Sequence, residues 1–165
     1  MATQKSSSKI EVGWKAPDFA LFDNQMKRRT LKEFSNGYLI LAFFPGAFTS
    51  TCTKEACTFR DSLAKLGTLK AKVLGISVND PWSSRAFAEK NMLNFPLLCD
   101  YNREVVKLYG LEQQNFAGLP GYTVAKRSVL ILDKTGTVRF VWISEDPGIE
   151  PNYVDIEKFL QETVQ

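Results

Sequence analysis

Apolar residues in the first half of the chain gather into runs that predict two buried strands with a helix between them. Residues 38–44 form an uninterrupted apolar run that ends at a Pro-Gly pair, which is typical of a central parallel strand covered on both faces. Residues 73–78 predict a second buried strand. Between the two runs, apolar residues recur every three or four positions and predict a helix: Ala56, Phe59, Leu63, Leu66 and Leu69.

Turn and capping residues divide the middle of the chain into further elements. Asp80 followed by Pro81 is typical of a helix start, and the helical pattern continues over residues 82–93. Residues 95–99 predict a short strand, which Pro96 either makes irregular at its start or confines to an edge of the sheet. The chain therefore continues to alternate between strand and helix.

The last part of the chain predicts a helix, a hairpin and a closing helix. A short helix is expected over 103–109 and ends at Gly110, and residues 111–126 are expected to be irregular. Two apolar segments flank Asp-Lys-Thr-Gly and predict a compact hairpin with Gly136 at positive φ: 128–132 and 137–143. The closing helix is expected over 152–163.

The order of these elements predicts the fold class and the extent of the domain. Residues 18–23 alternate loosely before a polar turn and predict a short edge strand or hairpin arm. Residues 1–9 are polar and Ser-rich, which predicts a flexible tail and no signal peptide. We expect a single domain over residues 10–165. It belongs to the α/β class, with a mixed central sheet flanked by helices on both faces and an N-terminal strand or hairpin extension.

Composition narrows the possible functions. The 165 residues include no histidine, so no Ser-His-Asp triad, Cys-His dyad or His-ligated haem can form within the chain. Three cysteines are too few for a four-ligand Cys/His zinc site. The net charge of +3 comes from scattered basic residues, so we expect no nucleic-acid binding. No apolar run approaches the roughly 20 residues of a membrane span. We therefore expect a cytoplasmic protein with reduced cysteines and no membrane association.

Cys52 is the strongest candidate for chemistry, because it follows the first buried strand and lies at the start of the first predicted helix. The positive end of a helix favours a thiolate. An ordinary thiol, with a pKa of about 8.5, is only about 3% ionised at pH 7, and lowering that pKa to about 6 requires about 3.4 kcal/mol. The helix end supplies roughly 0.3–2 kcal/mol, so a reactive Cys52 needs a cation from elsewhere in the fold. Without one, Cys52 is a small buried hydrophobic residue.

The segment that contains this cysteine resembles a known active-site signature. Residues 45–52 have the sequence P-G-A-F-T-S-T-C, which is similar to the P-x-x-x-[ST]-x-x-C signature of the peroxiredoxins, thiol peroxidases with a thioredoxin-like fold. Other segments resemble the same family in the same order along the chain: 13–19, 95–100 and 127–133. The resemblance covers the chain from about residue 11 onward and implies a thioredoxin-like fold.

The resemblance also implies roles for five residues. Cys52 would be the peroxidatic nucleophile, whose thiolate attacks a peroxide oxygen and becomes a sulfenic acid. Thr49 would hydrogen-bond the peroxide and the sulfur, and Pro45 would shield the pocket from water. Arg127 would be the required cation, and Glu55 would orient it through a charge-assisted hydrogen bond. Without the resemblance, Arg127 is an exposed charge at a strand start and Glu55 is an acid in the first turn of a helix.

A second thiol can condense with the sulfenic acid to form a disulfide. Cys57 lies five residues after Cys52, an arrangement that resembles the bacterioferritin-comigratory, or Q-type, branch, whereas the P-G-A-F-T wording is close to an atypical two-cysteine branch. On an ideal helix this spacing puts the two Cα atoms about 8.7 Å apart, whereas a disulfide needs less than about 7 Å. Resolution by Cys57 therefore requires the helix to unwind. Cys99, at the end of a predicted strand, is the weaker candidate, and an external thiol is a third.

The leading hypothesis is a thiol peroxidase that reduces hydrogen peroxide or small organic hydroperoxides and is recycled by a thioredoxin-like or other thiol reductant. The resemblance implies no metal and no cofactor, and a monomer or a homodimer. One alternative is a thiol–disulfide oxidoreductase, against which the absence of a C-x-x-C motif counts. Another is a non-enzymatic binding or holdase module with structural cysteines.

Overall fold

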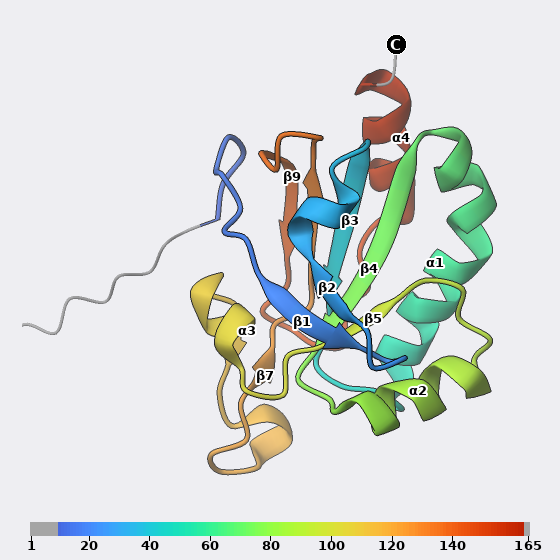
Figure 1. Ribbon diagram of the computed structural model, residues 1–165. Coiled ribbons are helices and arrows are strands. Elements are labelled where there is room, and N and C mark those ends of the chain that lie inside the picture. Colours follow the sequence, from blue (N-terminus) through green and yellow to red (C-terminus); the bar gives the residue numbers. More distant parts are fainter. Residues whose placement is uncertain (1–9, 164–165) are drawn as a thin grey trace, which may run out of the picture.

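The computed structural model describes residues 10–163, which are built around a seven-stranded mixed sheet (Figure 1). Its strands are β1 (Ala20–Asp23), β2 (Arg28–Thr30), β3 (Tyr38–Phe43), β4 (Ala71–Ser77), β5 (Leu97–Cys99), β8 (Ser128–Leu132) and β9 (Val138–Ile143). From edge to edge the order is β2-β1-β5-β4-β3-β8-β9. Strands β3, β4 and β5 are parallel, whereas β1 and β8 pair antiparallel to β5 and β3. The tail expected over residues 1–9 lies outside the described residues.

Strand β3 is apolar along its whole length because both of its faces are covered. Leu39, Leu41 and Phe43 point into one hydrophobic core, whereas Ile40 and Ala42 point into the other. Alternation of side chains along a strand sends successive residues to opposite faces. The interpretation of residues 38–44 as a central buried strand is therefore confirmed.

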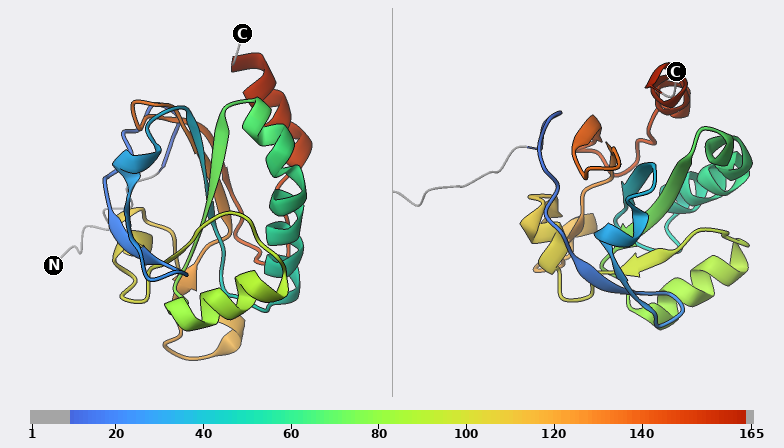
Figure 2. Two further views of the ribbon diagram at one scale, coloured as in Figure 1. Left: turned by 45° about the vertical axis from the view of Figure 1, so that its right-hand side comes forward. Right: turned by 45° about the horizontal axis from the view of Figure 1, so that its top comes forward.

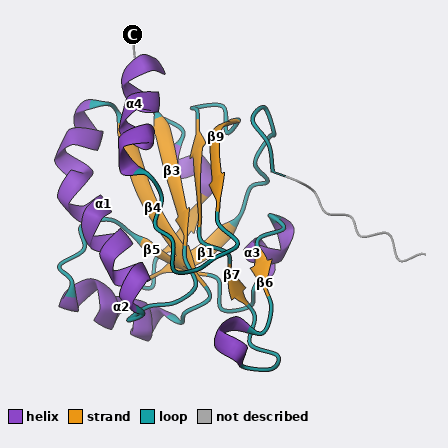
Figure 3. Cartoon of the chain, turned by 180° about the vertical axis from the view of Figure 1, so that it is seen from behind, coloured by secondary structure: helices purple, strands orange, loops and turns teal. Residues whose placement is uncertain are grey.

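The helices occupy both faces of the sheet, as expected, and are α1 (Ser50–Thr68), α2 (Pro81–Lys90), α3 (Glu104–Leu108) and α4 (Tyr153–Thr163). The view from behind shows α1, α2 and α4 in front of the sheet (Figure 3). Helices α1 and α4 lie side by side (Figure 2). The rings of Phe59 on α1 and Tyr153 on α4 pack edge to face, with their centroids 5.5 Å apart. Helix α3 packs into the opposite core through Val105 and Val106. None of the helices between residues 10 and 163 has the length and apolar character that a membrane span requires.

Most expected boundaries hold, and the exceptions have local causes. The Asp80 side chain accepts a hydrogen bond from the Ser83 backbone N–H at 2.8 Å and caps α2 as expected, but this helix ends at Lys90 because Met92 adopts a left-handed φ of 51°. Strand β5 begins at Leu97, after Pro96, and lies inside the sheet between β1 and β4. It is shorter than the expected 95–99, and the edge position that Pro96 would allow is wrong.

Residues 111–126, expected to be irregular, include regular structure. Strands β6 (Glu112–Gln113) and β7 (Val124–Ala125) pair with each other, and a short 3-10 helix lies between them at Phe116–Gly118. Each strand has only two residues, which is too short for a period of two to be visible in the sequence. A second 3-10 helix follows β2 at Leu31–Phe34.

The hairpin expected over residues 128–143 is present, and of the two alternatives for residues 18–23 the hairpin arm is correct and the edge strand is wrong. Strands β8 and β9 are joined by a turn in which Gly136 has a φ of 79°, as the sequence predicts. The N-terminal strand β1 pairs with β2 on one side and with β5 on the other, so β2 is the edge of the sheet. The N-terminal segment is therefore a hairpin arm added to the main sheet.

Candidate active site

The connection from β3 to α1 holds Cys52 in the first turn of a helix. Backbone and side-chain hydrogen bonds fix the connection: the Ala47 N–H donates to Asn79 Oδ1 at 2.9 Å, and the Thr49 hydroxyl donates to the Gly46 carbonyl at 2.9 Å. Phe48 between them adopts a left-handed φ of 66°, which lets the chain reverse into the helix. Thr49 is the N-cap residue of α1, so Cys52 faces the positive end of the helix.

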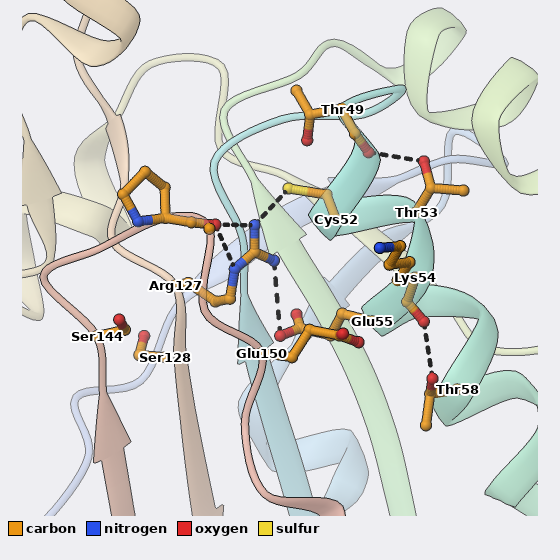
Figure 4. A network of polar contacts seen from close by, with 12 residues as sticks. Thr49, Cys52, Thr53, Lys54, Glu55, Thr58, Arg127, Ser128, Ser144 and Glu150 are labelled. Atoms are coloured by element: carbon orange, nitrogen blue, oxygen red, sulfur yellow. Dashed lines mark hydrogen bonds and ion pairs between the residues drawn. The ribbon is translucent and has the colours of Figure 1, made fainter.

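Arg127 lies directly against the Cys52 thiol, although 75 residues separate them in the sequence (Figure 4). Its Nη2 donates to Cys52 Sγ at 3.0 Å. Both side chains are about 99% buried, since each exposes only 1% of its surface. A guanidinium carries a permanent charge and stabilises a thiolate at this distance. The cation that a reactive Cys52 requires is therefore present.

The segment between β9 and α4 holds Arg127 in place. Arg127 Nε and Nη2 both donate to the Pro147 carbonyl, at 3.1 and 2.9 Å. The Arg127 carbonyl accepts a hydrogen bond from the Ser144 N–H at 2.9 Å. The guanidinium is thus fixed by a backbone acceptor on one side and by the sulfur on the other. A backbone carbonyl has no sequence signal, so Pro147 is absent from the sequence-based candidates.

Glu55 lies one helical turn after Cys52 and faces the other end of the guanidinium. Its Oε2 is 3.6 Å from Arg127 Nη1, a close ion pair but longer than the hydrogen bond expected from the sequence. Neither atom has a hydrogen-bond partner among residues 10–163. Burial raises the pKa of Glu55 to about 8, against the opposing effect of Arg127. A second carboxylate, Glu150, adds to this rise and accepts a hydrogen bond from the Tyr153 hydroxyl at 2.8 Å.

Pro45 and Thr49 lie at the same end of β3. Pro45 is buried, as a residue that excludes water must be, and Thr49 is half-buried. The Thr49 hydroxyl is bonded to the Gly46 carbonyl, and the Thr49 carbonyl accepts from the Thr53 hydroxyl at 2.8 Å. The structure thus gives the Thr49 side chain a backbone partner in place of the expected sulfur contact.

Cys57 lies on the same intact helix as Cys52 but contacts another element. The half-buried Cys57 thiol donates to Asn91 Oδ1 at 3.7 Å, and Asn91 Nδ2 donates to the Phe87 carbonyl at 2.9 Å. Arg60 Nη1 donates to the Asn91 carbonyl at 2.5 Å. Asn91, which the sequence does not single out, therefore links the α1 segment that carries Cys57 to the end of α2.

Cys99 is a thiol buried in the protein interior, where it contacts groups of α2 and β5. It contacts the Ser84 hydroxyl at 3.5 Å and the Leu97 carbonyl at 3.7 Å. Burial raises the pKa of Cys99 to about 11, which keeps this thiol protonated and unreactive at neutral pH. All three cysteines are free thiols, so the structure corresponds to the fully reduced protein.

Comparisons with known proteins place the chain among its relatives. The model of the AhpC/TSA family matches residues 12–141. A protein named peroxiredoxin Q, chloroplastic, from Gentiana triflora is 35% identical over 158 residues, and its counterpart from Arabidopsis thaliana is 37% identical over the same length. Each alignment covers 96% of this chain and 67% of the relative, so the chain spans about two thirds of the length of these relatives.

Solved structures share the fold over nearly the whole chain. The peroxidoxin BcpB from Mycobacterium tuberculosis superposes with a TM-score of 0.82 at 28% identity, covering 95% of this chain and 99% of the other. A PrxQ mutant from Xylella fastidiosa superposes with a TM-score of 0.84 at 20% identity, covering 96% and 99%.

Proposed function

The chain belongs to the AhpC/TSA family and is a thiol peroxidase of the peroxiredoxin type, and we propose that Cys52 is the thiol that attacks the peroxide. The single observation that supports this assignment is the 3.0 Å contact between Arg127 Nη2 and Cys52 Sγ at the start of α1. Helix end and guanidinium act on the same sulfur, and both favour the thiolate that the reaction consumes.

The reaction is a displacement at oxygen. The Cys52 thiolate attacks one oxygen of a hydroperoxide, the sulfur–oxygen bond forms as the oxygen–oxygen bond breaks, and water or an alcohol leaves after taking up a proton. Arg127 stabilises the negative charge as it moves from sulfur to the leaving oxygen. Because Cys52 exposes only 1% of its surface, hydrogen peroxide and small organic hydroperoxides are the substrates that fit best.

Pro45 and Thr49 complete the proposed site. The buried ring of Pro45 excludes water from the approach to the sulfur, and the Thr49 hydroxyl is free to exchange its Gly46 carbonyl for a peroxide oxygen. Glu55 fixes the far end of the Arg127 guanidinium through their 3.6 Å ion pair.

Cys57 is the proposed resolving thiol. Its attack on the sulfenic acid needs the two sulfurs to meet, and an intact helix keeps positions 52 and 57 about 8.7 Å apart. The first turns of α1 must therefore unwind in each cycle, and Cys57 must leave Asn91. A thioredoxin-like or other thiol reductant then reduces the disulfide. The raised pKa of the buried Cys99 disfavours this residue as the resolving thiol.

The proposal also covers the oligomeric state of the protein and its compartment in the cell. We expect a monomer or a homodimer. A cytoplasmic location remains our expectation from the sequence, whereas the curated relatives from Gentiana triflora and Arabidopsis thaliana are named chloroplastic. Fractionation of cells that produce the protein distinguishes the two compartments.

Peroxide consumption by Cys52→Ser tests the assignment. With a dithiol reductant in excess, the variant is expected to lose activity by a factor of at least about 10³, because serine is not ionised at neutral pH. Cys99→Ser is the matched control and keeps its activity, because Cys99 lies in the core away from the proposed chemistry. Unchanged peroxide consumption by Cys52→Ser would exclude Cys52 as the nucleophile.

A further inference from the structure

The peptide group that joins Gly46 to Ala47, in the loop before α1, is held at both of its polar ends. Its carbonyl, on Gly46, accepts a hydrogen bond from the Thr49 hydroxyl at 2.9 Å. Its N–H, on Ala47, donates to Asn79 Oδ1 at 2.9 Å. A trans peptide is planar, and its C=O and N–H point in opposite directions. The Asn79 side chain therefore fixes the direction in which the Gly46 carbonyl meets Thr49.

The Asn79 side chain is itself supported by the central sheet. Ser77, the last residue of β4, donates from its hydroxyl to Asn79 Oδ1 at 3.0 Å and accepts a hydrogen bond from the Asn79 backbone N–H at 3.3 Å. Ser77 exposes only 1% of its surface, so this support is buried. An amide oxygen has two lone pairs, and the Ala47 N–H and the Ser77 hydroxyl use both of them. The contacts thus run without a gap from β4 through Asn79 to the loop that carries Thr49.

Residues 45–49 need support from outside the loop because Phe48 adopts a left-handed φ of 66°. This conformation is costly for a bulky side chain and persists where the surroundings hold it. The Phe48 ring packs edge to face against Phe87 of α2, with the ring centroids 5.3 Å apart. The backbone just before Phe48 is held by Asn79, to which the Ala47 N–H donates. Asn79 and Phe87 thus hold the loop from the side of β4 and α2.

We propose that Asn79 is a positioning residue of the peroxidase reaction: it keeps the peptide of residues 46–47 in place and thereby holds the Thr49 hydroxyl where it meets the peroxide. This inference rests on the proposed function, in which Thr49 hydrogen-bonds the peroxide. It adds a residue from the connection between β4 and α2 to a site whose other side chains come from the β3–α1 segment and from Arg127. Asn79 acts through the loop and does not touch the peroxide.

The role of Asn79 is separate from the ionisation of Cys52. The Cys52 thiolate is stabilised by the start of α1 and by Arg127 Nη2, which lies 3.0 Å from the sulfur. The hydrogen bonds of Asn79 Oδ1 go to Ala47 and Ser77 and so involve neither of these groups. Loss of the Asn79 side chain is therefore expected to slow the reaction with peroxide while the pH dependence of the thiolate absorbance stays that of the parent protein.

Stopped-flow kinetics of Asn79→Ala test the inference. All proteins carry Cys57→Ser and Cys99→Ser, so that the thiolate absorbance reports Cys52 alone. We expect the second-order rate constant with hydrogen peroxide to fall about 2- to 13-fold, the equivalent of one hydrogen bond, while the absorbance titration overlays that of the parent. Asn79→Asp keeps the acceptor oxygen and is expected to restore most of the rate. Asn102→Ala, at an exposed asparagine, is the matched control and keeps the parent rate.

A double-mutant cycle with Thr49→Val measures whether Asn79 acts through the Thr49 hydroxyl. If it does, Asn79→Ala has no further effect on the rate constant in a Thr49→Val background. A purely structural role would lower the rate constant by the same factor in both backgrounds, which contradicts the inference. Ser77→Ala removes the hydroxyl bonded to Asn79 Oδ1 and provides the test if Asn79→Ala does not fold. A decrease in the rate constant is expected, and an unchanged one contradicts the inference.

The outcomes separate this inference from the proposed function. Mass spectrometry after one equivalent of peroxide reports whether Cys52 of the parent protein gained an oxygen. If Cys52 gained an oxygen, three results overturn the positioning role and leave the peroxidase assignment standing: Asn79→Ala reacts at the parent rate, its thiolate titration is shifted, or Asn79→Asp is as slow as Asn79→Ala. If Cys52 gained no oxygen, the proposed nucleophile itself is wrong.

Discussion

Phe43, the last residue of β3, and Ser128, the first residue of β8, are direct partners in an antiparallel pair. This register brings the start of β8 to the carboxyl end of β3. Arg127 precedes Ser128, and the chain after Phe43 leads into α1, so the guanidinium and the Cys52 thiol meet at one edge of the sheet. The central feature of the active site thus follows from the alignment of two strands.

Replacement of Arg127 tests the importance of this contact. Arg127→Gln removes the charge and is expected to lower both the ultraviolet thiolate absorbance at neutral pH and the rate constant with peroxide, the latter about 10²–10³-fold. Arg127→Lys is expected to recover part of both losses, because it keeps a charge but cannot contact the sulfur, the Pro147 carbonyl and Glu55 together.

Arg139→Gln is the matched control for the arginine variants, because Arg139 lies on the same hairpin with half of its side chain exposed. Stopped-flow kinetics of peroxide reduction should show no difference between this variant and the parent protein. Equal rates for Arg127→Gln and the parent would refute the role of the guanidinium.

Cys57→Ser is expected to change the product of a single oxidation. After one equivalent of peroxide, mass spectrometry should find a sulfenic acid on Cys52, since serine cannot form the disulfide, whereas the parent protein should contain a Cys52–Cys57 bond. Cys99→Ser should behave like the parent, because the Cys99 thiol is buried against Ser84. A Cys52–Cys99 disulfide in the parent would overturn the choice of resolving thiol.

Asn91 is expected to slow the formation of the disulfide, because Cys57 must leave its amide before α1 can unwind. Asn91→Ala removes this contact, and a hydrogen bond contributes about 0.5–1.5 kcal/mol. We expect disulfide formation after a peroxide pulse to be about 2- to 13-fold faster, as measured by quenched-flow alkylation. Met92→Ala changes the exposed neighbouring side chain and should leave the rate as it is. An unchanged rate in Asn91→Ala would mean that this contact does not control unwinding.

The Asp133 carboxylate is expected to make stability depend on pH in the acid range. Burial alone would raise the pKa of Asp133, but hydrogen bonds from Thr135, Arg139 and the Thr137 backbone lower it to about 2. Because the folded-state pKa lies below the unfolded one, this stabilisation is present above about pH 4 and is lost as the pH falls towards 2.

Asp133→Asn is therefore expected to reduce the free energy of unfolding by about 1–2 kcal/mol at neutral pH, with the difference from the parent narrowing below about pH 4. Urea denaturation at several pH values measures this. Glu145→Gln, at an exposed ion pair with Lys126, should change stability by less than about 0.5 kcal/mol at any pH. A gap between Asp133→Asn and the parent that persists at pH 2 would contradict the linkage.

Much of the fold is predictable from local pattern. The apolar run of β3, the capping of α2 by Asp80 and the turn at Gly136 each reflect a requirement of the residue in its own element, so the sequence reveals them. The mixed sheet, the helices on both faces and the thioredoxin-like fold are confirmed. The pairing of β6 with β7 is missed because two-residue strands carry no period.

The amino-acid composition and the order of the residues limit the chemistry that is possible. Without histidine, ionisation of Cys52 depends on a helix end and a cation, and the motif around Cys52 makes Arg127 the candidate for that cation. The contacts of these groups depend on the tertiary structure, which brings Arg127 against the sulfur and the Pro147 carbonyl, and Cys57 against Asn91. It also buried Glu55 beside Glu150, which raises the pKa of Glu55. Local patterns report which side chains are buried, but strand register and helix packing bring together residues far apart in the chain and set the solvation that fixes their charge.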